Sequence, residues 1–237
     1  MEKKTQIARK PIIQVSGVKK SFKVGQNKVK ALKGVDLDVN KGDFVVVFGP
    51  SGCGKTTLLN IIAGLDTPSS GEMKIGIRDL AKMDEDARAV FRSKIIGMVH
   101  QMSYWVKSLT TLENVALPLI IEGKKTKRAL EKAQEALDDL SVGELGGQLP
   151  TQLSGGQQQK VQLARALVTN PPIILADEPT GNLDSTSADE MMGLFDYLNK
   201  EHKRTIIMVT HNQSYWDSGT RRIEMHDGII VREATHG

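Results

Sequence analysis

Residues 43–62, DFVVVFGPSGCGKTTLLNII, constrain the fold of this chain more than any other stretch. The run DFVVVF at 43–48 is continuously β-branched and aromatic, as in a strand that is buried on both faces. A glycine-rich turn follows it, and then a segment with helical character. Because GPSGCGKT fits the pattern G-x-x-x-x-G-K-[ST] between a strand and a helix, it predicts a phosphate-binding P-loop in an α/β protein.

The glycine-rich loop has the residue types that bind a nucleoside triphosphate. Its glycines let backbone N–H groups turn toward the β-phosphate, Lys55 brings a charge to the β- and γ-phosphates, and Thr56 can bind Mg²⁺. The N-terminus of the following helix adds its dipole. We expect ATP to be held by Gly49, Pro50, Ser51, Gly52, Cys53, Gly54, Lys55, Thr56 and Thr57. The alternative is a glycine turn that binds no nucleotide.

The chain has a single cysteine, Cys53, and it lies inside this loop. One cysteine excludes an intramolecular disulfide. We interpret Cys53 as a small filler residue without a catalytic role. The alternative is a reactive thiol, because the amide-rich loop and the nearby Lys55 could stabilise a thiolate.

Two acidic residues end the apolar strand candidate IILADEP, residues 173–179. It delivers Asp177 and Glu178 at the carboxyl end of a strand, where ligands collect in parallel α/β sheets. Asp177 is expected to hold Mg²⁺, and Glu178 to accept a proton from an attacking water molecule. The alternative is an acidic strand end that is only solvated. The P-loop earlier in the chain favours the metal and catalytic roles over this alternative.

The stretch LSGGQQQ, residues 153–159, is a second candidate phosphate-binding loop. Ser154 and Gln157 have the spacing of a capping box, so an ordinary helix start is one interpretation. However, Gly155 and Gly156 lower helix stability and serve best where the backbone approaches a ligand closely. We therefore expect Ser154, Gly155, Gly156 and Gln157 to contact ATP.

The rest of the chain indicates one domain with an inserted helical part. Residues 11–39 contain short strands between glycine, lysine and asparagine turns, which predicts a small antiparallel layer. Strand candidates at 173–177 and 205–210 alternate with helices, as in a parallel sheet. Residues 111–140 are mostly helical. We expect a core subdomain of about 1–101 and 160–237 and an α-helical subdomain of about 102–159.

Composition narrows the class of protein further. The net charge of +4 and the isoelectric point near 9.0 come from basic residues interspersed with nearly as many acids, and only 4% of residues are aromatic. We therefore expect no nucleic-acid partner. No apolar run approaches the ~20 residues of a membrane span. The charged N-terminus has no apolar run behind it, so no signal peptide is expected, and the expected compartment is the cytosol.

With these motifs in place, the chain resembles the ATP-binding subunit of an ATP-binding cassette (ABC) transporter along essentially its whole length. GPSGCGKTT matches the family's Walker A motif, IILADEP its Walker B motif and LSGGQQQ its signature motif. Gln101 matches the Q-loop, GNLD at 181–184 the D-loop, and VTHN contains the switch histidine, His211. Six motifs stand in the family's order.

The resemblance implies further site residues. Gln101 would contact Mg²⁺ and the lytic water, His211 the γ-phosphate, and Asp184 would cross to a second subunit. Phe22 stands where the family usually has an aromatic that stacks on adenine; the alternative is a core phenylalanine. By resemblance, the catalytic residues are Glu178, His211 and Gln101, and the metal ligands are Thr56, Gln101 and Asp177.

Some segments resemble one class within the ABC family, and other positions differ from that class. FRSKIIGMVHQ, TLENVALPL and LADEPTGNLD are similar to the lipoprotein-releasing and macrolide-exporter class, and also to the ATPase that works with a permease-like protein in cell division. His100 replaces the usual aromatic, Asn212 replaces a common acid, and MSYWVKS at 102–108 replaces an apolar stretch. Tyr104 and Trp105 are either anchors for a membrane partner or ordinary packing residues.

The resemblance also implies partners and a location. Two copies are expected to sandwich two ATP–Mg²⁺ at the cytoplasmic face of the membrane. They would drive separate transmembrane permease subunits through residues 101–117, for export, lipoprotein release or mechanical transmission. The alternatives are a soluble ABC ATPase without a membrane partner and a non-catalytic nucleotide switch.

Overall fold

The computed structural model describes residues 11–235. The N-terminal ten residues, on which the expectation of no signal peptide rests, and residues 236–237 lie outside the described part. Its strands are β1 (Ile13–Val24), β2 (Asn27–Val39), β3 (Phe44–Phe48), β4 (Ser70–Ile75), β5 (Arg78–Asp79), β6 (Ile96–Val99), β7 (Ile173–Asp177), β8 (Thr205–Thr210), β9 (Arg221–His226) and β10 (Ile229–Thr235). Its α-helices are α1 (Lys55–Ile62), α2 (Glu85–Ile95), α3 (Thr111–Ile121), α4 (Thr126–Asp138), α5 (Gly155–Leu167) and α6 (Ser185–Lys200).

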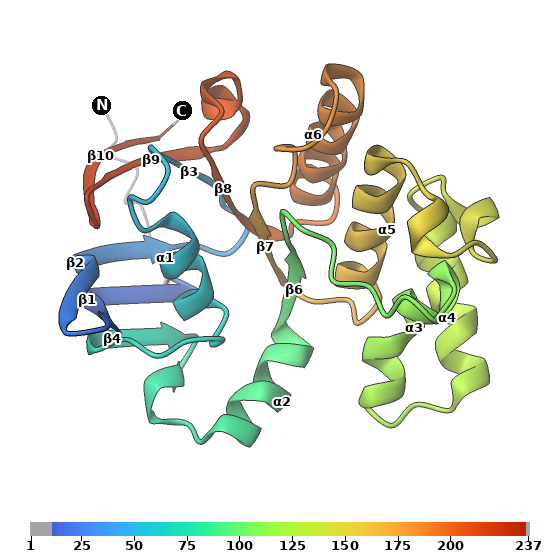
Figure 1. Cartoon of the computed structure of the whole chain (residues 1–237), viewed down its shortest axis with the longest axis horizontal. Coiled ribbons are helices and arrows are strands. Elements are labelled where there is room, and N and C mark those ends of the chain that lie inside the picture. Colours follow the sequence, from blue (N-terminus) through green and yellow to red (C-terminus); the bar gives the residue numbers. More distant parts are fainter. Residues whose placement is uncertain (1–10, 236–237) are drawn as a thin grey trace, which may run out of the picture.

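The expected antiparallel layer is present, in the strand order β2-β1-β4-β5. It occupies the left side of Figure 1, where β1, β2 and β4 lie next to α1. Residues 29–39, which the sequence suggested as separate short strands, belong to one strand, β2, that pairs with β1 along its whole length. The two strands remain continuous because β-bulges absorb the irregularities instead of turns.

The second sheet has the order β10-β9-β3-β8-β7-β6 within residues 11–235. Its strands β9, β3, β8, β7 and β6 are parallel neighbours, which confirms the expected parallel core. β10 pairs antiparallel with β9 and closes one edge. The β9–β10 hairpin was not predicted from the sequence, because charged residues interrupt its apolar ones and leave no continuous apolar run.

The parallel sheet is buried on both faces, as the run at 43–48 predicts. Val45 and Val47 of β3 pack toward α1, in the core that also contains the apolar face of the antiparallel layer. Phe44 and Val46 pack on the other side, in the core that includes α5, α6 and the helical insertion. The helix that follows the glycine loop contacts β2 of one sheet and β7 and β8 of the other. Both sheets therefore hold that loop in place.

The helical insertion consists of α3, α4 and the start of α5, on the right of Figure 1. The predicted helical stretch at 111–140 is interrupted near Gly123, whose φ of 86° ends α3 before α4 begins. α5 contacts α3 and α4 but also lies against β6. A Cβ on Gly97 of β6 would lie 2.4 Å from the Ala166 carbonyl oxygen, so helix and strand are packed backbone to backbone. α5 thus runs continuously across the expected subdomain boundary at residue 160.

Among the described residues, no helix has both the length and the apolar character needed to cross a lipid bilayer.

Candidate nucleotide-binding and catalytic site

The candidate site lies at the carboxyl ends of three adjacent parallel strands, β3, β8 and β7. Their register aligns Val47, Val209 and Asp177 in one row. The glycine loop, Glu178 and His211 follow directly after this row. Three segments that are far apart in the sequence are therefore brought together by strand pairing.

The glycine loop is shaped by close backbone approaches. Gly54 has a φ of 105°, and a Cβ there would lie 2.6 Å from the Ala31 carbonyl oxygen of β2. A Cβ on Gly49 would lie 2.3 Å from the Met225 carbonyl oxygen of β9. Glycine is required at both positions because any side chain would collide with backbone.

Lys55 is the first residue of α1 and is only 6% exposed. Its Nζ donates hydrogen bonds to the carbonyl oxygens of Gly49 at 2.7 Å and Pro50 at 3.1 Å. No carboxylate forms a salt bridge with this ammonium group within the described residues. The Lys55 ammonium group is therefore a buried cation that donates hydrogen bonds to carbonyl oxygens at the N-terminus of a helix. Such a group suits an anionic ligand.

Cys53 is buried in the same loop, at 4% exposure. Its Sγ lies 2.8 Å from the position a Cβ would take on Gly49, and its carbonyl oxygen accepts a hydrogen bond from the Gly228 N–H at 2.9 Å. These contacts support the interpretation of Cys53 as a filler that packs the loop against the β9–β10 turn.

Asp177 and Thr56 are joined across the site. The Thr56 hydroxyl donates to Asp177 Oδ1 over 3.1 Å. Burial raises the pKa of the Asp177 carboxyl above its usual range, while the hydrogen bond from Thr56 opposes that rise. A nearby divalent cation would favour the charged form of this carboxyl, so the pair suits a site for a hard cation.

Glu178 directly follows β7 in a strained conformation, with a φ of 47°. Its N–H donates to the Val209 carbonyl oxygen at 3.0 Å, which fixes the backbone against β8. Its Oε1 lies 2.9 Å from the Nδ1 of His211, while its Oε2 is buried without a hydrogen-bond partner among the described residues. An orphaned buried carboxylate oxygen calls for a proton donor such as water or substrate.

The remaining residues implied by the resemblance lie around this centre. Gln101 is exposed after β6, and its Nε2 lies 3.5 Å from the position of a Cβ on Gly181 in the D-loop. Asp184 caps α6 of its own chain, accepting from the Ser187 N–H at 3.0 Å and the Ser187 hydroxyl at 2.8 Å. These bonds hold the pKa of the Asp184 carboxyl below its usual value.

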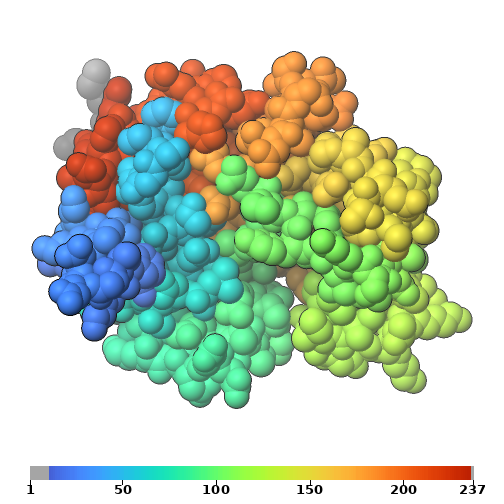
Figure 2. All heavy atoms as spheres, viewed as in Figure 1, coloured from blue at the N-terminus to red at the C-terminus, as the bar shows by residue number. Residues whose placement is uncertain are grey.

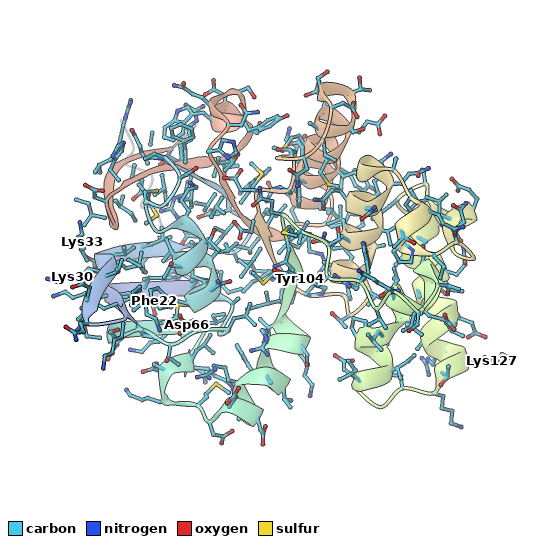
Figure 3. The ribbon with its side chains drawn as sticks, in the orientation of Figure 1. Phe22, Lys30, Lys33, Asp66, Tyr104 and Lys127 are labelled. Atoms are coloured by element: carbon cyan, nitrogen blue, oxygen red, sulfur yellow. The ribbon has the colours of Figure 1, made fainter. Side chains whose placement is uncertain are left out.

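Phe22 is 41% exposed on β1, so it is not the core phenylalanine of the alternative interpretation. The Lys20 Nζ lies 5.1 Å from the centre of its ring. Figure 3 labels Phe22 on the antiparallel layer. An exposed ring on this layer is available for stacking.

The LSGGQQQ stretch forms the N-terminus of α5 with a complete capping box. The Ser154 Oγ accepts from the Gln157 N–H at 3.3 Å, and Gln157 Oε1 accepts from the Ser154 N–H at 2.9 Å. A Cβ on Gly156 would lie 2.8 Å from the Ser187 Oγ of α6. Gly156 therefore has a packing role within its own chain that the sequence did not indicate. Gly155 is exposed and its nearest neighbours would be 3.7 Å from a Cβ, so no packing contact requires it.

The segment after Gln101 is attached to α5 by hydrogen bonds that the sequence did not indicate. Gln162 Oε1 accepts from the His100 N–H, and Gln162 Nε2 donates to the Ser103 hydroxyl at 2.9 Å. Trp105 Nε1 donates to Gln158 Oε1 at 3.1 Å. The Arg165 guanidinium lies 4.5 Å from the centre of the Trp105 ring. The Q-loop segment and the signature helix are therefore joined at several points.

The two aromatics of this segment differ in environment. Trp105 is partly buried in the helical core, which favours ordinary packing for that residue. Tyr104 is 68% exposed, with its ring edge-on to His100 at 5.3 Å between centroids. Its position on the front of the molecule is labelled in Figure 3.

Comparison with known proteins agrees with this geometry. A family model described as ABC transporter matches residues 32–181. An ABC transporter ATP-binding protein of Methanocaldococcus jannaschii is 46% identical, over 93% of this chain and 98% of its own length. This chain belongs to the ABC transporter family. Its predicted fold and general function, those of an ABC ATPase that serves as a nucleotide-binding subunit, are confirmed.

Other ABC proteins show which members of the family this chain is similar to. The lipoprotein-releasing system ATP-binding protein LolD of Legionella pneumophila is 42% identical, over 89% of this chain and 93% of its own length. The macrolide export ATP-binding/permease protein MacB of Aggregatibacter actinomycetemcomitans is 43% identical over 94% of this chain, which spans only 34% of that protein. The solved structure of the cassette MJ0796, a dimer bound to ADP and Pi, superposes with a TM-score of 0.89 at 40% identity, covering 95% of this chain and 99% of that one.

The contact between Gly156 and Ser187 yields a prediction about stability. Gly156→Ala should destabilise the isolated chain by about 1 kcal/mol, because its Cβ would press on the Ser187 side chain of α6 and displace its hydroxyl from Asp184. Gly155→Ala is the matched control and should change the free energy of unfolding by less than about 0.5 kcal/mol. Urea unfolding of both variants measures the difference. Equal stability of the two variants would show that the α5–α6 contact does not constrain Gly156.

Proposed function

We propose that two copies of this ABC ATPase close around two ATP molecules and that hydrolysis drives transmembrane permease subunits from the cytoplasmic face of the membrane. The observation that carries the proposal is Glu178. Its Oε2 is buried and unpaired, its Oε1 faces His211, and its backbone is strained at the end of β7. A carboxylate held in this way can receive a proton from a water molecule.

The chemistry assigned to these residues is phosphoryl transfer to water. Glu178 takes a proton as the water oxygen attacks the γ-phosphorus, and the bond from that phosphorus to the β–γ bridging oxygen breaks to leave ADP. His211 orients Glu178 through Nδ1 and places its other ring nitrogen toward the γ-phosphate. Lys55 stabilises the charge on the phosphate oxygens, and Gln101 holds the water molecule. Phe22 stacks on the adenine ring.

The donor set fits Mg²⁺. Thr56 and Asp177 offer two hard oxygen atoms that are already within hydrogen-bond distance of each other. No cluster of three or more His, Cys, Asp or Glu side chains that could hold a metal ion occurs within residues 11–235. This scarcity suits Mg²⁺, which keeps several waters and takes phosphate oxygens as ligands. When bound, Mg²⁺ would neutralise charge on the β- and γ-phosphates; Thr56, Asp177 and Gln101 would position it.

The signature motif is assigned to ATP held by the other copy. Within one chain, Gly155 lies beside Asn182 and Leu183 of the D-loop. The side of Gly155 that no neighbour fills can face a phosphate, with the α5 N-terminus behind it. The dimeric arrangement of MJ0796, whose fold this chain matches along almost its whole length, supports a two-copy site. Asp184 would lie at the same dimer interface.

A groove next to the Q-loop segment is the proposed contact for the permease. It has a volume of about 330 Å³ and lies between α2 and β6 on one side and α3 and α5 on the other. Figure 2 shows the hollow between these parts of the front surface. Arg92 and Arg165 line it, and their guanidinium groups donate to the carbonyl oxygens of Gly64 at 3.0 Å and Tyr104 at 2.7 Å. The exposed side chain of Ile121 adds an apolar contact.

The names of the relatives suggest what kind of transport ATP hydrolysis by this chain drives. One is named for lipoprotein release and another for macrolide export, and in the latter the ATP-binding part is joined to a permease in one chain. We extend this to the present chain as release or export of a substrate from the membrane, with the permease carried by separate subunits.

The assignment of Glu178 predicts the behaviour of one variant. Glu178→Gln should lower the ATP hydrolysis rate by a factor of about 10² or more, because it removes the proton acceptor and keeps the shape. ATP binding should persist, and size-exclusion chromatography should show an ATP-dependent dimer. Turnover at the wild-type rate would contradict the assignment of the base.

The assignment of the signature motif predicts a second effect. Gly155→Glu adds an acid at an exposed position at the N-terminus of α5, which the helix dipole tolerates in the monomer. The acid should repel the phosphates of ATP held by the other copy. In a Glu178→Gln background, the variant should therefore bind ATP as a monomer and no longer dimerise. Loss of ATP binding by the monomer would instead place the motif at the site of its own chain.

A further inference from the structure

A lysine-rich face lies on the β1–β2 hairpin, on the side of the sheet opposite to Phe22. Directly opposite residues of paired strands point to the same side of a sheet. The register pairs Lys19 with Lys33, Ser21 with Lys30, and Lys23 with Lys28. The lysine face therefore consists of Lys19, Lys23, Lys28, Lys30 and Lys33. Figure 3 labels Lys30 and Lys33 at the left edge of the molecule.

The five lysines concentrate positive charge at the hairpin end of the sheet, while the exposed acids of β2, Asp36 and Asp38, lie farther along the strand. All five side chains are exposed, and none forms a side-chain hydrogen bond or salt bridge within residues 11–235. Five positive charges exceed the net charge of the entire chain, which is +4. Two of the cross-strand pairs are lysine opposite lysine, an arrangement that destabilises a sheet. Such repulsion is relieved when an anionic surface lies over the face.

The chemistry of the face points to anionic lipid headgroups. We propose that the lysine face binds the surface of a bilayer containing anionic phospholipids. Its charges spread over about 13 Å along β1, since each strand residue advances about 3.3 Å. Flexible ammonium groups without a pocket suit mobile headgroups, and each lysine near an anionic leaflet adds to the attraction. The proposal does not depend on the hydrolysis mechanism.

Two other macromolecules fit less well. A protein partner would require an apolar centre, and the apolar residues of the hairpin, such as Phe22 opposite Val29, alternate to the other side. A nucleic acid would also attract the lysines through its phosphates, but the lysine face has no aromatic residue on which bases could stack, so nucleic-acid binding is kept as an outcome of the test. Lys20, on the side of Phe22, forms a salt bridge with Asp66 and is not part of the face.

The experiment is sedimentation of the full chain with vesicles. Wild-type protein should sediment with equimolar phosphatidylglycerol and phosphatidylcholine, and not with phosphatidylcholine alone. Lys23→Gln/Lys28→Gln/Lys30→Gln should weaken partitioning by at least about tenfold. The control Lys41→Gln/Lys132→Gln/Lys203→Gln has the same net charge and should sediment like the wild type. ATP hydrolysis should be unchanged in both variants, and Lys28→Gln/Lys30→Gln provides a milder second test if the triple variant fails to fold.

Several outcomes would overturn the proposal. Equal loss of binding in the control would reduce the effect to net charge, and unchanged binding of the hairpin variant would exclude the lysine face. Displacement of the protein by inorganic phosphate at a matched phosphate concentration would assign the face to a free anion. Tighter binding to duplex DNA than to the vesicles at the same salt concentration would assign it to nucleic acid.

Discussion

Parallel pairing of β3, β8 and β7 is the constraint on which the rest of the site depends. It places Val47, Val209 and Asp177 in one row, so that the glycine loop, His211 and Glu178 leave the sheet at the same edge. The Glu178 N–H bonds to the Val209 carbonyl oxygen and transmits this register directly to the carboxylate. A slip of one residue in either pairing would turn these side chains to the opposite face of the sheet.

Close packing around glycine residues then fixes the loop at this edge of the sheet. The loop glycines Gly49 and Gly54 lie against carbonyl oxygens of β9 and β2, so both sheets contact the loop. Lys55 lies buried at the end of this loop, and its hydrogen bonds go to the carbonyl oxygens of Gly49 and Pro50. Gly156 lets α5 approach the Ser187 side chain of α6, and Gly155 lies beside the D-loop. The same residue type therefore shapes two different parts of the site.

Much of this arrangement could be predicted from local sequence, and the rest depends on long-range contacts. The strand, glycine loop and helix at 43–62 have a pattern that few folds satisfy. Once this pattern indicates a P-loop, the acidic strand end at 177–178 can be assigned to the metal and the attacking water. The charged β9–β10 hairpin has no such pattern. The contact of Gly156 with Ser187 and the hydrogen bond of Trp105 with Gln158 join positions far apart in the chain, which spacing alone does not reveal. The lysine face likewise follows from the strand register.

We propose that each ATP is hydrolysed between two copies of the chain, one supplying the P-loop and Glu178 and the other the signature motif. The most direct measurement is the rate of ATP hydrolysis per chain as a function of protein concentration at saturating ATP. If hydrolysis needs two copies, this specific rate rises with concentration and levels off as the dimer becomes saturated. A specific rate that stays constant down to concentrations at which the protein is monomeric would contradict it.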